Sequence, residues 1–294
     1  MKTKKWIFVF ACALMTGMAT SCDEKPVPSP DDEIPPHITP PEPPVPVDPT
    51  FDKGEGVIRL VSYNVGAFSK YTYSIEMIAK MMKELDADVV GMNEVDSVTT
   101  RTSREHQVKK LAEKMGGWHY YYGRAMPYQG GAYGNAIVLS PSYKKTGEYR
   151  IAIPKGSGSE PRSCAVVKSD KFVYMATHLD VKNEAARLEG ARLITEWAKD
   201  NYGNSDMPVF LCGDMNCEPS DAPIAQLKKD WQLISVTDNT YPSRGATKCI
   251  DFIFVLKNKA QVEAVGSAVP LEFEHGRVTD ASDHLPVYAD VKIK

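Results

Sequence analysis

The chain has 294 residues, of which 43% are hydrophobic and 25% are charged, a composition ordinary for a globular protein. Its 35 Lys and Arg residues nearly balance 38 Asp and Glu residues, and the formal net charge is −3. A protein that grips nucleic acid without sequence preference usually carries a basic surplus, which the totals do not show. The length suits one large α/β domain with a substantial core, once the N-terminal segment is set aside.

The N-terminus has the pattern of a secretory signal. Residues 1–5 are basic, and residues 6–19 form an apolar run too short for a comfortable membrane span. Small residues then lead into Cys22, and the pattern resembles a bacterial lipoprotein signal spanning residues 1–21, with Cys22 lipidated. Cleavage by an ordinary signal peptidase near residue 19 is the alternative. We therefore expect an exported protein, anchored to the outer membrane or cell surface, with the periplasm as the alternative location.

Residues 22–55 read as a Pro-rich acidic linker. Proline lacks an amide hydrogen and fixes φ, so this stretch favours extended polyproline II over helix or sheet. At about 3.1 Å per residue it would hold a domain well away from a membrane anchor, although a tail without a spacing role fits equally. The remaining residues, 56–294, carry a charge near +1 and form the predicted catalytic domain.

Cysteines in this domain leave two readings open. Cys164, Cys212, Cys217 and Cys249 are an even set, which permits disulfides in an exported protein. Three of them adjoin apolar, strand-like runs, so buried free thiols are at least as good an explanation. Their spacing matches no zinc pattern.

Apolar runs interleaved with helical periods predict a mixed α/β fold. In chain order, strands are expected at 57–63, 88–94, 118–123, 135–139, 143–153, 162–168, 171–178, 208–212, 249–255 and 285–292. Helices are expected at 73–85, 103–115 and 184–197, and a loop rich in Gly and Tyr at 126–134. Polar residues stand at or just after the ends of several strands: Asn64, Glu94, His178, Asp214 and Asn216. Strand ends are where α/β sheets gather ligand sites, so together these residues indicate a site, although each alone would suit a turn.

Short motifs follow one another along the domain in a fixed order. They are Ser62-Tyr-Asn64-Val, Asn93-Glu94-Val, Gly134-Asn135-Ala-Ile, Thr177-His178-Leu, Gly213-Asp214-Met-Asn216, Ile250-Asp251-Phe-Ile and Ser282-Asp283-His284-Leu-Pro. Their residues and order resemble the endonuclease/exonuclease/phosphatase superfamily, the DNase-I-like metal-dependent phosphoesterases. The resemblance covers about residues 57–294. It implies a four-layer α/β sandwich with two mixed β-sheets flanked by helices, and a site at one edge of the sheets.

Phosphoester hydrolysis explains these residue types independently. It needs a cation on the phosphoryl oxygens, a deprotonated water in line, and donors for the developing charge. Glu94 is the natural metal ligand, since Mg²⁺ prefers carboxylate oxygens. Mn²⁺ is the alternative metal. A salt bridge at the end of the strand is the alternative role for Glu94. The resemblance implies that Asn64 assists the metal or phosphate and that Asp283 lies near the metal. Gly66 stands where the family often has an acidic residue, which leaves one or two metals open.

The resemblance also assigns acid-base roles. His284 would be the general base or a His that faces the phosphate, with Asp251 fixing its tautomer. Asp214 would position or activate the attacking water, and Asn216 would donate to the phosphate. His178 would stabilise the transition state as a donor when protonated.

Two further residues are predicted to bind substrate. Arg162 suits bidentate phosphate contact, with an exposed salt bridge as the alternative. Asn135 would contact substrate, with a simple turn as the alternative. Tyrosines within 120–133 would either stack on a base or sugar or pack in the core.

The sequence thus predicts an exported, membrane-tethered, monomeric hydrolase that depends on Mg²⁺. Its substrate would be a phosphoester in a lipid headgroup, a nucleic acid or a small phosphate ester, cleaved by phosphodiesterase, nuclease or phosphatase chemistry. A lipoprotein that only binds ligand on the same scaffold is the alternative. The full set of polar site residues disfavours this non-catalytic alternative, because a site that has lost its catalytic activity has no chemical need for all of them.

Overall fold

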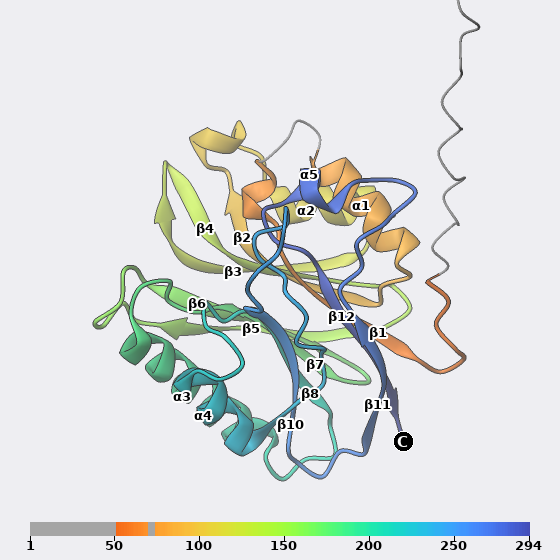
Figure 1. Cartoon of the computed structure of the whole chain (residues 1–294), viewed down its shortest axis with the longest axis vertical. Helices are drawn as coiled ribbons and strands as arrows, with labels where there is room; N and C mark the ends of the chain where they lie inside the picture. The colour runs from red at the N-terminus through yellow and green to blue at the C-terminus, as the bar shows by residue number, and fades with distance from the viewer. Residues whose placement is uncertain (1–50, 70–73) are drawn as a thin grey trace, which may run out of the picture. The chain divides into compact units, whose positions relative to one another are not determined.

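The computed structural model describes residues 51–69 and 74–294 and shows two stacked β-sheets between helices (Figure 1). The predicted signal peptide, Cys22 and most of the linker lie outside the described residues. The first sheet has the order β11-β12-β1-β2-β4-β3, built from β1 (Ile58–Asn64), β2 (Val89–Ser97), β3 (His119–Tyr128), β4 (Gly131–Leu139), β11 (Val262–Ala268) and β12 (Val287–Ile293). The second has the order β5-β6-β7-β8-β10-β9, built from β5 (Lys145–Ile153), β6 (Arg162–Ser169), β7 (Val173–His178), β8 (Val209–Asp214), β9 (Trp231–Leu233) and β10 (Asp251–Leu256).

Helices cover the outer face of each sheet. On the first sheet lie α1 (Ser74–Glu84), α2 (Gln107–Lys114) and α5 (Val278–Ala281); on the second lie α3 (Glu184–Tyr202) and α4 (Ala222–Asp230). Short 3₁₀ turns, η1 (Gly66–Phe68) and η2 (Thr100–Thr102), follow β1 and β2. The predicted four-layer sandwich with two mixed sheets is confirmed.

The three apolar layers follow from the alternation of side chains along each strand. In β1, Leu60 packs between the two sheets, while its neighbour Val61 packs under the helices. Both residues are fully buried, as expected for a strand covered on both faces. The Tyr174 hydroxyl crosses the central layer and donates to the Val61 carbonyl at 2.8 Å, which ties the two sheets together.

Strand register brings the predicted site residues together. Each sheet contains one parallel pair, β1 with β2 and β7 with β8, so the carboxyl ends of these strands lie side by side. Asn64 is level with Asn93 in the first sheet, and His178 is level with Asp214 in the second. Asp251, at the start of the antiparallel strand β10, is also level with Asp214. Three short stretches of pairing therefore place most of the site.

The predicted loop at 126–134 is wrong, because most of it belongs to a hairpin. Strand β3 continues to Tyr128 and β4 begins at Gly131. The turn between them has φ values of 42° at Gln129 and 77° at Gly130, and left-handed residues suit a tight hairpin turn. Gly and Tyr were therefore signs of a turn and its flanking strands.

Helix α4 and strand β11 were not predicted. Helix α4 has nine residues and only three of them are buried, so its helical period is short. Strand β11 lies at a sheet edge with none of its residues fully buried, so it lacks an apolar run. Both elements are stabilised by neighbours far away in sequence, which a local pattern does not show.

All four cysteines of the domain are buried free thiols, which decides between the two readings. Within residues 51–69 and 74–294, none of the helices has the length and apolarity needed to cross a membrane.

Candidate active site

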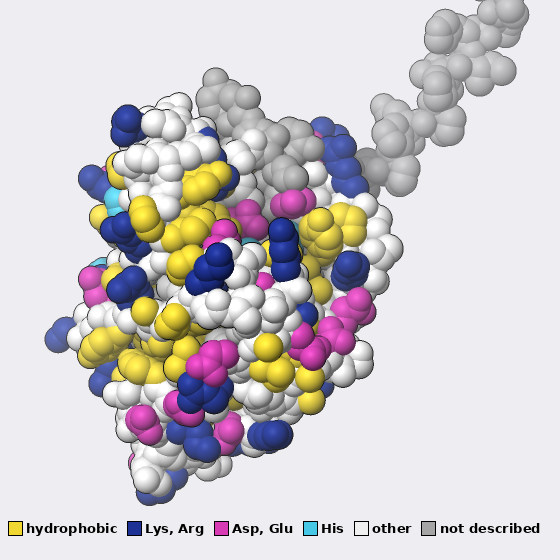
Figure 2. Space-filling view, turned by 90° about the vertical axis from the view of Figure 1, so that its left-hand side faces the viewer, with side chains coloured by type: hydrophobic (Ala, Val, Ile, Leu, Met, Phe, Trp, Pro, Cys, Tyr) yellow, Lys and Arg dark blue, Asp and Glu magenta, His cyan; other side chains and the backbone are white. Residues whose placement is uncertain are grey.

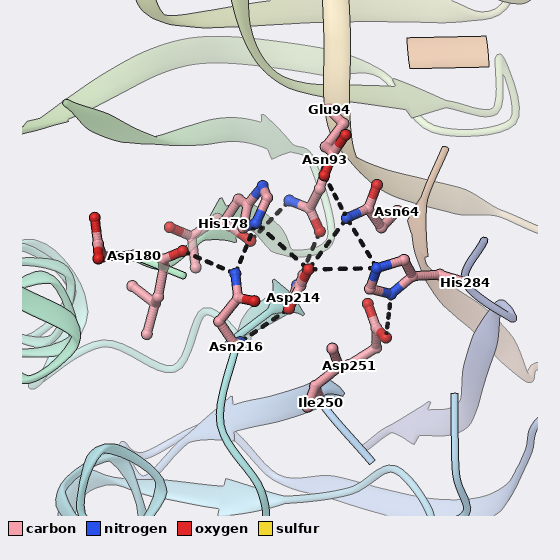
Figure 3. A network of polar contacts seen from close by, with 12 residues as sticks. Asn64, Asn93, Glu94, His178, Asp180, Asp214, Asn216, Ile250, Asp251 and His284 are labelled. Atoms are coloured by element: carbon pink, nitrogen blue, oxygen red, sulfur yellow. Dashed lines mark hydrogen bonds and ion pairs between the residues drawn. The ribbon is translucent and has the colours of Figure 1, made fainter. Parts of the chain in front are cut away.

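Polar side chains from both sheets converge at the carboxyl ends of β1, β7 and β8 and at a bulge within β2 (Figure 3). Of the predicted site residues, those that line one cavity of about 570 Å³ are Glu94, Arg162, His178, Asp214, Asn216, Asp283 and His284. Asn64, Asn135 and Asp251 do not line this cavity and are at most 2% exposed. The cavity lining also includes Tyr133, Glu160, Glu218, Asp221, Tyr241 and Lys248.

Glu94 reaches the site through a bulge in β2. The register with β4 shifts between Met92 and Val95, and Glu94 has a φ of 57°. Left-handed backbone is uncommon for a residue with a Cβ, and such strain clusters at functional sites. The bulge turns Glu94 out of the regular alternation and towards the cavity, as bulges beside active sites often do.

Asn93, the neighbour of Glu94, is a hub that the sequence did not single out. Its Oδ1 accepts the backbone N–H of Asp214 at 2.9 Å. Its Nδ2 donates to Asn135 Oδ1 at 2.8 Å and to the Thr177 carbonyl at 2.7 Å. The Asn93 amide thus joins four strands, β2 and β4 of the first sheet and β7 and β8 of the second. The available signal was a polar residue directly before Glu94 in an otherwise apolar strand.

Asn135 is a supporting residue, and the predicted substrate contact is not supported. Its Oδ1 accepts from Asn93, and its Nδ2 donates to the Ser163 carbonyl at 2.8 Å. It is 2% exposed. Both ends of the amide are occupied by protein partners, so its role is to hold Asn93.

Gly213 allows the close pairing that positions Asp214. Its φ is 142°, and a Cβ built there would overlap the backbone of Thr177. Any other residue would force β7 and β8 apart, and would separate Asp214 from His178.

Asn64 orients the two acidic groups of the centre. Its Nδ2 lies 3.1 Å from Asp214 Oδ2 and 3.3 Å from Glu94 Oε1. Its Oδ1 accepts the backbone N–H of Gly66 at 3.1 Å. In this arrangement Asn64 turns a donor towards the carboxylates, and the predicted assistance to a metal would require the amide to be reversed.

Asp214 is a buried carboxylate with defined partners. It is 2% exposed, and its Oδ1 accepts the backbone N–H of Asn216 at 2.9 Å. Burial, together with the nearby Asp251 carboxylate, raises the pKa of Asp214, while His284 and the hydrogen bonds from Asn216 and Asn64 act in the opposite direction. The result is a carboxylate of increased basicity facing the cavity.

His284 lies between two carboxylates. Its Nδ1 is 2.9 Å from Asp251 Oδ2, and its Nε2 is 3.7 Å from Asp214 Oδ2. Thr240 Oγ1 donates to the same Asp251 oxygen at 2.6 Å. Burial lowers the pKa of His284, but the Asp251, Asp214 and Asp283 carboxylates outweigh it and raise the pKa to about 9. A cationic imidazolium suits the phosphate-facing role better than the general-base role.

His178 differs from its predicted state. Burial, then the charges of Arg162 and His284, lower its pKa well below the usual value, so the ring is neutral. Its Nε2 lies 2.8 Å from Asn216 Nδ2, while its Nδ1 is buried with no hydrogen-bond partner among the described residues. If Nε2 accepts from Asn216, the proton is on Nδ1. The expectation of a protonated donor is therefore not supported.

Asn216 links His178 to Asp214. Its backbone N–H binds Asp214, and its Nδ2 is also 3.1 Å from the Leu179 carbonyl. Its φ of 49° is left-handed, a second strained position at the centre. The predicted donation to phosphate would compete with these contacts.

Glu94 is the residue best suited to hold a divalent cation. It lines the cavity, its Oε1 accepts from Asn64, and within the described chain no Lys or Arg forms an ion pair with it. Asp214, Asp251 and His284 also bring ligand atoms within 4.8 Å of one another, but His284 already bonds to Asp251. Mg²⁺ and Mn²⁺ favour carboxylate oxygens, and the Glu94 carboxylate is a ligand of that kind on the cavity lining.

Asp180 fixes the loop that leads to Arg162. Its Oδ2 accepts from Ser159 N at 2.6 Å and Ser159 Oγ at 2.7 Å, and its Oδ1 accepts from the backbone N–H groups of Lys182 and Asn183. Burial raises the pKa of Asp180, but these hydrogen bonds outweigh it and hold the pKa below its usual range.

Asp180→Asn is expected to destabilise the fold by about 1–3 kcal/mol at pH 7, because buried N–H groups lose a charged acceptor. The pKa of Asp180 is lower in the folded protein than its unfolded value of about 3.9. The contribution of Asp180 to the free energy of unfolding is therefore fully present above about pH 3.9 and is lost progressively as the pH falls below that value. Urea unfolding of both proteins from pH 7 to pH 3 measures the difference. Asp206→Asn, at an exposed position, is the control. A difference that is constant across this range would contradict the assignment.

The chain is similar in sequence to a protein family and in fold to several solved structures. Residues 61–284 match the model of the Endonuclease/Exonuclease/phosphatase family. A mannosyl-6-phosphatase of Bacteroides thetaiotaomicron is 20% identical, with a TM-score of 0.62, over 80% of this chain and 99% of that chain. An endonuclease/exonuclease/phosphatase of Bacteroides vulgatus is 20% identical, with a TM-score of 0.63, over 81% and 99%. D. rerio TDP2 complexed with a single-strand DNA product is 18% identical, with a TM-score of 0.61, over 81% and 100%. The comparison with curated proteins gave no match.

Proposed function

The chain belongs to the endonuclease/exonuclease/phosphatase family, and we propose that its cavity hydrolyses phosphoester bonds with the help of Mg²⁺ or Mn²⁺. The observation that carries the proposal is the convergence of Glu94, Asp214 and His284 on one cavity from both sheets. The alternative of a scaffold that only binds ligand gains no support. A pocket without buried charged groups would bind a ligand equally well and would avoid the free-energy cost of burying those charges.

A bound cation would polarise the phosphoryl oxygens and offset their charge, and Glu94 is the residue placed to hold it. Arg162 lines the cavity beside it, with Nη2 held 3.2 Å from Glu160 Oε1 and with Nε and Nη1 free of hydrogen bonds to described residues. A fixed guanidinium of this kind suits a phosphate oxygen.

Asp214 is placed to take a proton from the attacking water. The Asn216 N–H and the Asn64 amide hold its carboxylate in one orientation, so no reorganisation is needed as the proton moves. The water oxygen bonds to phosphorus, the ester P–O bond breaks, and the leaving oxygen takes a proton.

His284 is placed to stabilise the charge that develops on the phosphoryl group. Asp251 holds its Nδ1, which leaves Nε2 as the donor on the cavity side. A preorganised donor in a buried site stabilises a transition state more than it would in water. His178 and Asn216 then act as positioning residues for Asp214.

Turnover before and after metal removal tests the proposal. We expect the full chain with Mg²⁺ or Mn²⁺ to release nitrophenol from p-nitrophenyl phosphate or from bis(p-nitrophenyl) phosphate, to lose this activity in EDTA, and to recover it when metal is returned. Activity that persists in EDTA would overturn the metal requirement. Metal binding without turnover of either ester would favour the ligand-binding alternative.

A further inference from the structure

The outer part of the cavity is acidic. Glu160, Glu218 and Asp221 line it, against the cations Arg162 and Lys248. Glu160 and Arg162 already form an ion pair at 3.2 Å. The outer part of the cavity, which we call its mouth, therefore carries the carboxylates of Glu218 and Asp221 and a single ammonium group, that of Lys248.

This charge pattern opposes a nucleic-acid strand. A single strand carries a negative charge about every 3.4 Å of helix axis, so phosphates beside the scissile one would fall at the mouth. In the face drawn in Figure 2, Lys and Arg side chains stand apart among Asp and Glu, and no continuous basic stripe crosses its described part. Along the cavity lining, a polyanion would thus meet carboxylates with Arg162 and Lys248 as the only Lys or Arg side chains to compensate them.

The same mouth suits a hydroxyl-rich group. Carboxylates accept hydrogen bonds from hydroxyls, and such charge-assisted bonds are stronger than neutral ones. The Tyr133 and Tyr241 side chains add aromatic lining, which offers an apolar face to the carbon skeleton of a ring.

Both tyrosines are held in place. The Arg101 guanidinium carbon lies 4.6 Å from the Tyr128 ring centroid and 5.8 Å from that of Tyr133. Arg101 in turn makes bonds of 2.6 and 2.9 Å to the fully buried Asp96. The Tyr241 ring packs 4.8 Å from the His284 ring. Such fixed walls favour a ligand of defined shape.

The size of the cavity points the same way. A volume of about 570 Å³ lies within the range of small-molecule sites, roughly 300–1,000 Å³. The catalytic end of the cavity is lined by His178, Asp214 and His284, each at most 5% exposed. Because this end is enclosed by protein, only one substituent of the bound phosphate has room to extend towards the mouth.

We propose that the substrate is a phosphomonoester of a neutral, hydroxyl-rich small molecule, such as a sugar or another polyol. The inference rests on the proposed function and narrows it to one substrate class. Water oxygen bonds to phosphorus, the P–O bond to the polyol breaks, and the polyol oxygen takes a proton. The products are orthophosphate and the free polyol.

Competing substrates test this inference. The probes are glucose 6-phosphate, a short oligonucleotide with a 3′-terminal phosphate, and p-nitrophenyl phosphate, each with the full chain and Mg²⁺. We expect kcat/KM for the hexose phosphate to exceed that for the oligonucleotide at least about tenfold. Glu218→Lys, at an exposed position, should narrow this ratio about tenfold, mainly through KM. Glu272→Gln, also exposed, is the control and should leave the ratio unchanged.

The outcomes separate the two proposals. Turnover of p-nitrophenyl phosphate with a preference for the oligonucleotide would overturn the substrate class and leave the hydrolase intact. A hexose preference that Glu218→Lys does not alter would overturn the role of the acidic mouth. Hydrolysis of bis(p-nitrophenyl) phosphate without turnover of any of these monoesters would likewise overturn the substrate class alone, and only the absence of turnover of that diester as well would count against the proposed function itself.

Discussion

Asp214→Asn is expected to lower the turnover of any phosphoester substrate by at least about 10³-fold while the protein stays folded. The substitution keeps the size and shape of the side chain and removes the group that takes the proton. The amide would also direct N–H groups at Asn64 Nδ2 or at the Asn216 N–H, both of which donate to Asp214 in the native protein. The loss should therefore appear in kcat.

The matched control is Asp206→Asn, an identical change at an exposed position. It should retain full activity. Thermal unfolding separates a chemical effect from a structural one, because the lost acceptor for the Asn64 and Asn216 donors should lower the stability by only about 1–3 kcal/mol and leave the protein folded at the assay temperature. Native-like activity in Asp214→Asn would show that another group accepts the proton.

Much of the centre could be predicted from sequence because the register of a parallel strand pair is regular. A polar residue at the end of each of two adjacent parallel strands must lie beside its partner, as His178 and Asp214 do at the ends of β7 and β8. Recognition of apolar strands with polar ends was sufficient to expect them in one place.

Protonation states could not be predicted in this way. His178 ends β7 and His284 lies in the bend before β12, and both are buried, yet the pKa of His178 falls and the pKa of His284 rises to about 9. The difference comes from neighbours: Arg162 acts on one ring, and Asp251 with Asp214 acts on the other. Such charges are distant in sequence, and only the folded chain brings them together.

Supporting residues were the other omission. Asn93 was given no role, and Asn135 was predicted to contact substrate, because hydrogen bonding between sheets leaves no local pattern that would reveal a supporting role. In the structure they form a buried relay from Asp214 to the Ser163 carbonyl. The bulge that turns Glu94 into the cavity is likewise a product of pairing with β4 and not of a recognisable turn sequence.

Glu94→Gln should have the second large effect, on metal dependence. A neutral amide is a weaker ligand for a hard cation than a carboxylate, so the Mg²⁺ concentration for half-maximal activity should rise at least about tenfold. The Gln Oε1 can still accept from the Asn64 amide, which Asp214 also continues to orient. Glu272→Gln supplies the same chemical change at an exposed position and should behave like the native protein.

The most direct test of a metal-dependent phosphoester hydrolase centred on Glu94 is a Mg²⁺ titration of turnover. Native protein, Glu94→Gln and Glu272→Gln are stripped with EDTA and assayed side by side on one phosphoester. We expect no activity without metal, superimposable curves for native protein and Glu272→Gln, and a curve for Glu94→Gln shifted to much higher Mg²⁺. Identical titration curves for all three proteins, or full activity without metal, would contradict it.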